Sequence, residues 1–221
     1  MSDIAANFEN VLRKIRRAEF SSGREEGAAK LVAVSKMQSM KSIRAALDCG
    51  QRLFGENRVQ EAQDHWADLK QEFPDIVLHL IGPLQTNKVR DAVALFDCIH
   101  TIDREKLASS LAEEMKKQGR NLPCLIQVNT GEEEQKAGIV PSRLPEFLEY
   151  CTKDCGLDIK GLMCIPPVDE PPALHFALLK KLAQENALTQ LSMGMSADYE
   201  RAVALGATYV RVGSLLFGDR A

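Results

Sequence analysis

Residues 31–54 read LVAVSKMQSMKSIRAALDCGQRLF and contain one complete unit of a repeating pattern. It begins with four apolar residues, passes through a short loop, and then places apolar residues three and four positions apart over residues 40–49. This order predicts a strand followed by an amphipathic helix. Gly50 follows the helix, where a left-handed cap is expected, and a second apolar run begins at Leu53.

The same unit recurs along the chain. Apolar runs predict eight strands, at residues 31–34, 53–54, 78–81, 98–102, 124–128, 159–165, 190–193 and 209–212. Helical spacing predicts a helix at residues 4–18 before the first strand, and others at residues 40–49, 59–71, 86–95, 104–118, 144–151, 172–186 and 197–205. Strands that alternate with helices indicate parallel βαβ units with right-handed crossovers.

Eight such units without a break in composition predict one closed (β/α)8 barrel, a TIM barrel, that spans residues 1–221 as a single domain. A doubly wound open sheet is the alternative, but it usually has fewer strands and often a glycine-rich first turn. Neither G-x-G-x-x-G nor G-x-x-x-x-G-K-[ST] follows Val34, which disfavours dinucleotide and P-loop chemistry.

Composition and charge limit the possible partners. The 221 residues include 28 basic and 31 acidic side chains, so a net charge of −3 argues against a nucleic-acid binder. The N-terminal residues mix charges without the apolar region of a signal peptide, and no apolar run reaches bilayer length. The six cysteines are irregularly spaced, which predicts reduced thiols in a cytoplasmic protein rather than a metal site or disulfides.

Two cationic side chains follow the inward faces of predicted strands. Alternate strand residues point into a barrel, so Lys36 continues the face of Val32 and Val34, and Arg211 points inward from the last strand. Two cations at one barrel mouth imply an anionic ligand, because an isolated buried charge costs several kcal/mol. The alternatives are a solvated strand end for Lys36 and an ion pair with Glu56 for Arg211.

The loops after the seventh and eighth predicted strands carry glycines and hydroxyls. Residues 192–196 read Ser-Met-Gly-Met-Ser, and Gly213 and Ser214 precede a short final segment at residues 215–217. In barrel enzymes a phosphate commonly lies between these two loops, at the N-terminus of a short extra helix. Glycine allows the backbone to approach, and N–H and hydroxyl groups donate to the anion. The simpler alternative for Ser196 is a helix N-cap.

A phosphate site beside an inward lysine predicts a phosphorylated carbonyl ligand, because the first and eighth strands are neighbours in a closed barrel. Proximity to Arg211 would favour a neutral, nucleophilic Lys36 amine. Pyridoxal 5′-phosphate supplies both an aldehyde and a phosphate, and its sites use a Schiff-base lysine with Asp or Arg at the pyridine nitrogen. A barrel that binds a phosphosugar is a further alternative.

Six segments together resemble the YggS/PROSC family, the pyridoxal phosphate homeostasis proteins. They are AVSK (33–36), FGEN (54–57), HLIGPLQTNK (79–88), GLM (161–163), SMGMS (192–196) and VRVG (210–213). The matching positions extend over nearly the whole chain, from residue 33 to residue 220. The resemblance implies a barrel like the N-terminal domain of alanine racemase, with pyridoxal 5′-phosphate held as an internal aldimine.

The resemblance also implies roles for individual residues. Lys36 corresponds to the Schiff-base lysine and Arg211 to the partner of the pyridine nitrogen. The remaining implied cofactor contacts are the phosphate ligands Ser196, Gly213 and Ser214 with the backbone near Met195, the ring neighbour Asn57, and the pocket-lining His79 and Met163. Taken alone, a histidine in an apolar strand, such as His79 or His100, is more often a hydrogen-bonded core residue.

Departures from the family's pattern are few. Met37 and Gln38 stand where relatives commonly have Thr and a basic residue, which removes the basis for a second lysine beside Lys36. Ser214 replaces a common Thr and keeps the hydroxyl, and Cys164 replaces a usual Ala.

Two classes of function remain: a protein that holds, buffers and delivers pyridoxal phosphate, and a pyridoxal-phosphate-dependent amino-acid racemase or decarboxylase. Racemisation needs acid/base groups on both faces of the substrate, and in alanine-racemase-like enzymes one comes from a separate β domain. Because this chain stops at Ala221, we expect that domain to be absent. An arginine at the ring nitrogen would also weaken the electron sink.

We therefore expect a carrier without catalytic residues or a metal. Its partners are expected to be the cofactor, pyridoxal-phosphate-dependent apo-enzymes and free amino acids, and neither nucleic acid nor membrane. A monomer is expected, because no exposed apolar stripe is evident in the sequence.

Overall fold

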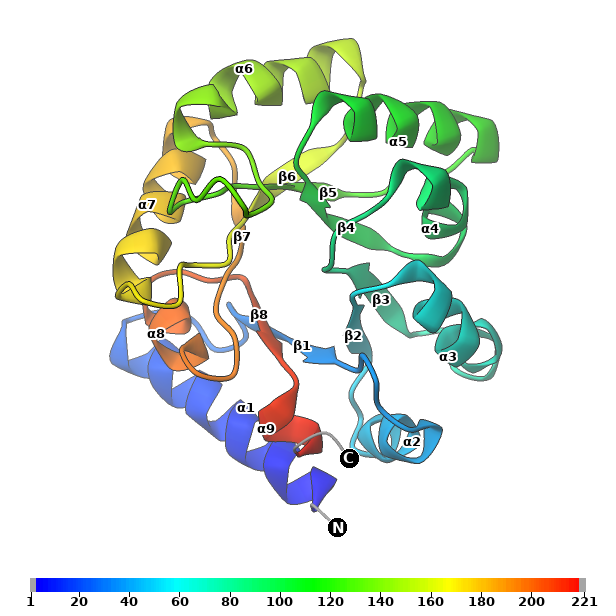
Figure 1. Cartoon of the computed structure of the whole chain (residues 1–221). Helices are drawn as coiled ribbons and strands as arrows, with labels where there is room; N and C mark the ends of the chain where they lie inside the picture. The colour runs from blue at the N-terminus through cyan, green and yellow to red at the C-terminus, as the bar shows by residue number, and fades with distance from the viewer. Residues whose placement is uncertain (1–2, 219–221) are drawn as a thin grey trace.

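In the computed structural model, which describes residues 3–218, the strands form a closed parallel barrel (Figure 1). Each strand pairs with its neighbours in chain order, and β1 pairs with β8 to close the ring. The predicted (β/α)8 barrel is confirmed. The strands are β1 (Lys30–Val34), β2 (Leu53–Glu56), β3 (Val77–Leu80), β4 (Cys98–Ile102), β5 (Cys124–Gln127), β6 (Ile159–Met163), β7 (Gln190–Ser192) and β8 (Tyr209–Val212).

Helices follow the strands and cover the outside of the barrel (Figure 1). They are α2 (Met40–Asp48), α3 (Val59–Glu72), α4 (Val89–Leu95), α5 (Glu105–Gln118), α6 (Leu144–Glu149), α7 (Pro172–Glu185) and α8 (Tyr199–Ala204). A 3-10 turn, Thr86–Lys88, leads into α4, another, Pro141–Arg143, leads into α6, and a π-helical turn, Tyr150–Asp154, continues α6. None of the helices within residues 3–218 has the length and apolar character needed to cross a membrane.

The first helix, α1 (Ile4–Ser21), covers the barrel where the chain after β8 forms only the short helix α9 (Ser214–Phe217). The ring of Phe8 meets the ring of Phe217 edge-on, with centroids 6.1 Å apart. The side-chain amide of Asn7 donates to the Leu216 carbonyl at 3.0 Å. Since α1 also packs against α2 and α8, it takes the place of the eighth outer helix (Figure 1).

Alternation along the strands separates two apolar regions. In β1, Leu31 and Ala33 belong to the main core between the strands and the helices. Val32 faces the barrel interior, where a Cβ placed on Gly55 of the neighbouring strand would lie 2.8 Å from its side chain. The predicted alternation of β1 is therefore confirmed, and Lys36 follows Val34 on the inward side.

The boundaries of some elements differ from prediction. The helix predicted at residues 197–205 begins only at Tyr199, because residues 195–198 form a turn in which Asp198 Oδ1 accepts the Met195 N–H at 2.6 Å. The strand predicted at residues 159–165 ends at Met163. The expected glycine cap is present at Gly50, whose φ is +84°.

Candidate functional site

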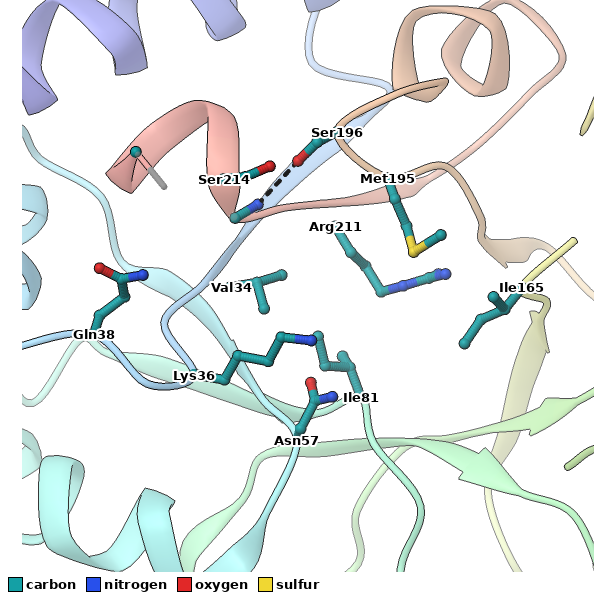
Figure 2. A pocket seen from close by; sticks show the side chains of 12 residues that line it. Val34, Lys36, Gln38, Asn57, Ile81, Ile165, Met195, Ser196, Arg211 and Ser214 are labelled. Carbon is teal, nitrogen blue, oxygen red and sulfur yellow. Dashed lines mark hydrogen bonds between the residues drawn. The ribbon is translucent and has the colours of Figure 1, made fainter. Parts of the chain in front are cut away.

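The C-terminal ends of the strands surround a cavity of about 480 Å³ (Figure 2). This volume falls within the range of roughly 300–1,000 Å³ typical of small-molecule sites. The lining comes from the ends of β1, β2, β3, β6, β7 and β8 and the loops after them. The lining residues are Val34, Lys36, Gln38, Asn57, Ile81, Ile165, Met195, Ser196, Arg211, Gly213, Ser214 and Gly218.

Most of the predicted site residues meet in this cavity. Those that line it are Lys36, Asn57, Met195, Ser196, Arg211, Gly213 and Ser214. His79 and Met163 were expected to line the pocket but are not among its lining residues. Both are buried inside the barrel, Met163 in a small apolar cluster with Cys98 and Leu125. Alternation tells which side of a strand a residue faces, but not how far along the barrel axis it lies.

Other lining residues escaped the sequence analysis. Ile81 directly follows β3, inside one of the segments that carry the family resemblance, so its position gave a usable signal. Gln38 and Ile165 lie on loops, and Gly218 follows α9. The conformations of these loops depend on tertiary packing, and no spacing rule predicts them.

Lys36 is held at the end of β1 by bonds of the residues beside it. Figure 2 shows its side chain extended into the cavity toward Asn57 and Ile81. The preceding hydroxyl, that of Ser35, donates to Glu56 Oε1 at 2.7 Å, which ties the start of this loop to β2. The following residue, Met37, has a left-handed backbone with φ +57°, and its N–H donates to Glu61 of α3. The lysine therefore leaves a loop that is fixed on both sides.

Glu56 is a buried carboxylate behind this loop. Its Oε1 accepts from Ser35, from the Trp66 indole at 3.0 Å, and interacts with His65 Nδ1 at 3.4 Å. The hydrogen bond to Glu56 raises the pKa of His65, although burial opposes the shift. The alternative ion pair between Arg211 and Glu56 is wrong, because Glu56 faces α3 on the outside of the strand while Arg211 faces the interior.

Arg211 lies deep in the cavity and is only 4% exposed. Its guanidinium donates to Ser192 Oγ at 2.7 Å and to the Cys164 carbonyl at 2.9 Å. Both acceptors are uncharged oxygens, and burial lowers the pKa of Arg211 from its ordinary value. Among residues 3–218 the hydrogen-bond acceptors of this guanidinium are neutral, and such a buried cation is well suited to meet an electron-rich atom of a ligand.

The other end of the cavity is lined by hydroxyls. Ser196 Oγ accepts the Gly213 N–H at 3.4 Å, which joins the β7 loop to the start of α9, where Ser214 lies (Figure 2). The alternative of a helix N-cap for Ser196 is wrong, because Asp198 occupies the N-cap position of α8. Gly194 has φ +90°, and a Cβ there would lie 2.4 Å from the Ala202 Cβ, so glycine is needed for the loop to reach this position.

Comparison with known proteins identifies the family. The family described as "Alanine racemase, N-terminal domain" matches residues 5–221. A pyridoxal phosphate homeostasis protein of Vibrio cholerae is 40% identical over 230 residues, which cover 100% of this chain and 98% of the relative. The chain belongs to the pyridoxal phosphate homeostasis protein family. A second member of this family, from Aquifex aeolicus, is 41% identical, with 96% of each chain covered.

Solved structures agree with this membership of the pyridoxal phosphate homeostasis proteins. PipY of Synechococcus elongatus with PLP bound has a TM-score of 0.79 and 38% identity, covering 92% of this chain and 100% of PipY. The PipY structure without PLP has a TM-score of 0.81 and 40% identity, covering 93% of this chain and 99% of PipY. Alanine racemase of Clostridium difficile has a TM-score of 0.73 at 16% identity, covering 97% of this chain and 57% of the racemase. This last match shows that the barrel fold is shared.

Proposed function

We propose that the cavity binds pyridoxal 5′-phosphate and that the protein serves pyridoxal phosphate homeostasis by holding, buffering and delivering the cofactor. The observation that carries the proposal is that the Lys36 amine, the Arg211 guanidinium and the hydroxyls of Ser196 and Ser214 line one small cavity. When bound, the cofactor supplies an aldehyde that forms a reversible covalent bond with an amine. The names of the relatives and the PLP-bound PipY structure support this assignment.

The residues present fit that ligand group by group. In our proposal Lys36 holds the aldehyde carbon, and Asn57 lies beside the ring. Arg211 donates to the ring nitrogen, which it can do because a guanidinium has donors only. The phosphate is held at the hydroxyl-lined end of the cavity by Ser196, Gly213, Ser214 and the backbone near Met195.

The character of Arg211 favours a carrier over an enzyme. A guanidinium cannot accept a proton at neutral pH, so it favours an unprotonated ring nitrogen, which withdraws electrons from a substrate less strongly. The second candidate is a pyridoxal-phosphate-dependent amino-acid racemase or decarboxylase. The observation in its favour is the fold shared with alanine racemase. Because the cavity opens to solvent at the barrel mouth, free amino acids and recipient apo-enzymes are the proposed partners of the carrier.

The proposal includes the oligomeric state of the protein and its cellular compartment. We infer a single cofactor-binding domain that acts as a monomer in the cytoplasm. The six cysteines are free thiols, four of them buried, as is usual for proteins of reducing compartments.

Borohydride reduction tests the covalent assignment. The wild-type protein mixed with pyridoxal 5′-phosphate is expected to gain an absorption band at a longer wavelength than the absorption of the protein alone. Reduction should then fix the cofactor to the peptide that contains Lys36, as read by mass spectrometry. Lys36→Ala should abolish the fixed label, whereas Lys41→Ala, which removes an exposed lysine of α2, should keep it. A label on any other lysine in the wild-type protein contradicts the assignment.

Incubation of the cofactor-loaded protein with a panel of L-amino acids separates the two candidate functions. The carrier is expected to exchange slowly with the amines and to give neither D-amino acids nor CO₂. Catalytic chiral inversion or CO₂ release, followed by chiral chromatography and gas detection, would establish the racemase or decarboxylase instead.

A further inference from the structure

A line of polar side chains leads from Arg211 into the barrel interior, below the cavity. Arg211 donates to Ser192 Oγ at 2.7 Å. Ser192 Oγ lies 2.9 Å from His100 Nδ1, and His100 Nε2 lies 2.9 Å from His79 Nδ1. His79 and Ser192 are 4% and 0% exposed, so each bond in this line is shielded from water. Polar groups in such a place are costly unless each one is satisfied.

We propose that Ser192, His100 and His79 are positioning residues that form a hydrogen-bonded chain with one fixed direction and hold the guanidinium of Arg211 toward the cavity. The use of this chain in cofactor binding rests on the proposed function. The direction of the chain follows from Arg211 alone, because a guanidinium donates and never accepts.

The direction can be followed atom by atom. Ser192 Oγ accepts from Arg211, and its single hydroxyl proton has His100 Nδ1 as its hydrogen-bond partner. Were His100 Nδ1 to carry a proton instead, the buried hydroxyl proton would be left without that acceptor, at the cost of an unmade hydrogen bond. His100 is therefore protonated on Nε2, which donates to His79 Nδ1, and His79 in turn carries its proton on Nε2.

The surroundings keep both imidazoles neutral. Burial lowers the pKa of His79 to about 4, and burial, with His79 and Arg211 nearby, lowers the pKa of His100 well below its ordinary value. The Tyr209 ring packs against both imidazoles, with centroid distances of 5.2 and 5.4 Å. Arg211 is thus the cation among the four hydrogen-bonded side chains. Its charge is directed to the ligand, because Ser192, His100 and His79 stay neutral.

Cys98 lies close enough for a different arrangement. Ligating atoms of His79, Cys98 and His100 fall within 4.8 Å of one another, a spacing that a metal ion could use. Burial raises the pKa of Cys98 to about 12, so the thiol keeps its proton, and the two imidazole nitrogens that face each other already share a hydrogen bond. These observations favour the hydrogen-bonded chain.

The imidazole tautomers test the chain in the protein without ligand. Long-range ¹H–¹⁵N spectra of the ¹⁵N-labelled wild type should show His79 and His100 as neutral Nε2–H tautomers at pH 7, unchanged on addition of EDTA. The whole sequence contains four histidines, so their signals are separable. The proposal would be overturned if His100 were the neutral Nδ1–H tautomer or if either histidine were protonated at pH 6. It would also be overturned if EDTA changed the spectra of the two histidines.

Ser192→Ala tests the support of Arg211. The variant removes one of two acceptors of the guanidinium, so the Kd for pyridoxal 5′-phosphate should rise about fivefold to tenfold, with a shifted absorption band of the bound cofactor. Thr208→Val is the matched control, because it removes a hydroxyl, directly before β8, that accepts the Leu191 N–H of β7, and Thr208 does not line the cavity. The control should lose stability but keep the Kd and the spectrum.

Wild-type affinity and spectrum in Ser192→Ala would overturn the positioning role. If the wild-type protein bound no pyridoxal 5′-phosphate, the proposed function would fail. The tautomers alone would then show whether the hydrogen-bonded chain exists. If Ser192→Ala failed to fold, the tautomers of the wild type would likewise decide.

Discussion

Single positions set the shape of the cavity. Gly82 follows β3 and lies against the backbone of Asn57, which lines the cavity. A Cβ at residue 82 would be 2.3 Å from the Asn57 carbonyl oxygen and 2.6 Å from its Cα. Backbone cannot move aside as the end of a side chain can, so only glycine allows these two loops to meet.

Gly82→Ala should therefore displace Asn57. We expect a loss of unfolding free energy of about 1–3 kcal/mol, as for other overpacked sites, together with weaker binding of pyridoxal 5′-phosphate. Urea unfolding and a spectroscopic titration measure the two effects. Gly119→Ala is the control, because its φ of +63° makes alanine costly while nothing near the cavity is touched. Equal affinity in both variants would contradict this role of Gly82.

Part of the cavity's lining could be predicted from the sequence. The sides on which Lys36 and Arg211 lie were predictable, because strand alternation fixes the face of each residue. His79 and Met163 are not among the lining residues, since alternation carries no information on height along the barrel axis, and their contact with the cofactor stays a prediction. The orientation of Glu56 was available from alternation, because Phe54 on the same face belongs to the outer core, but the ion-pair alternative did not use it.

The short helix α9 depends on α1 for its position. The Phe8–Phe217 contact and the bond from Asn7 to Leu216 join the two helices, and Ser214 at the start of α9 lines the cavity. A four-residue helix has little stability of its own. The position of Ser214 is therefore set largely by a helix from the other end of the chain.

Phe8→Ala should weaken both stability and binding. Removing a buried aromatic ring typically costs about 3–5 kcal/mol of unfolding free energy. We expect a higher Kd for pyridoxal 5′-phosphate as well, because α9 loses its packing. Leu107→Ala, a buried truncation in α5, serves as the comparison and should lower stability without changing the Kd. Denaturant unfolding and titration distinguish the two, and an unchanged Kd in Phe8→Ala would refute the coupling.

Element types were predictable to a large extent, and element ends less so. Apolar periodicity located every strand of the barrel within residues 3–218, because each strand must bury residues between two layers. The start of α8 was missed because residues 196–198 form a separate turn, in which the Asp198 side chain accepts the Met195 N–H. Such a local side-chain bond leaves no trace in the periodicity.

The barrel interior combines an apolar cluster with buried neutral imidazoles. The pKa of His79 lies at about 4 in the folded protein, against an ordinary value of 6.5. Unfolding exposes this imidazole, so the unfolded chain binds a proton that the folded chain does not bind over this range. Acid therefore favours the unfolded state.

Stability should fall as the pH drops from 6.5 to about 4. For a shift of this size, His79 alone contributes on the order of 3 kcal/mol, present in full above pH 6.5 and lost as the pH falls through the window. Urea unfolding at pH 7.5, 6 and 4.5 measures the trend. The effect of His65 on stability has the opposite sign, because its pKa is raised in the folded protein. Its contribution to stability is present below the pKa of the unfolded state and is lost as the pH rises. His79→Gln should flatten the acid slope, and an unaltered slope would count against burial as its cause.

The closure of the barrel also orders its assembly in time. β1 pairs along its length with β8, and the bond from Asn7 to Leu216 spans 209 positions of the chain. A nascent chain that ends before residue 209 cannot provide β8 as the second partner of β1, nor α9 as the partner of Phe8 and Asn7 in α1. The first segment synthesised can meet β2 and α2 early, but it completes its native contacts only when the last segment has been made.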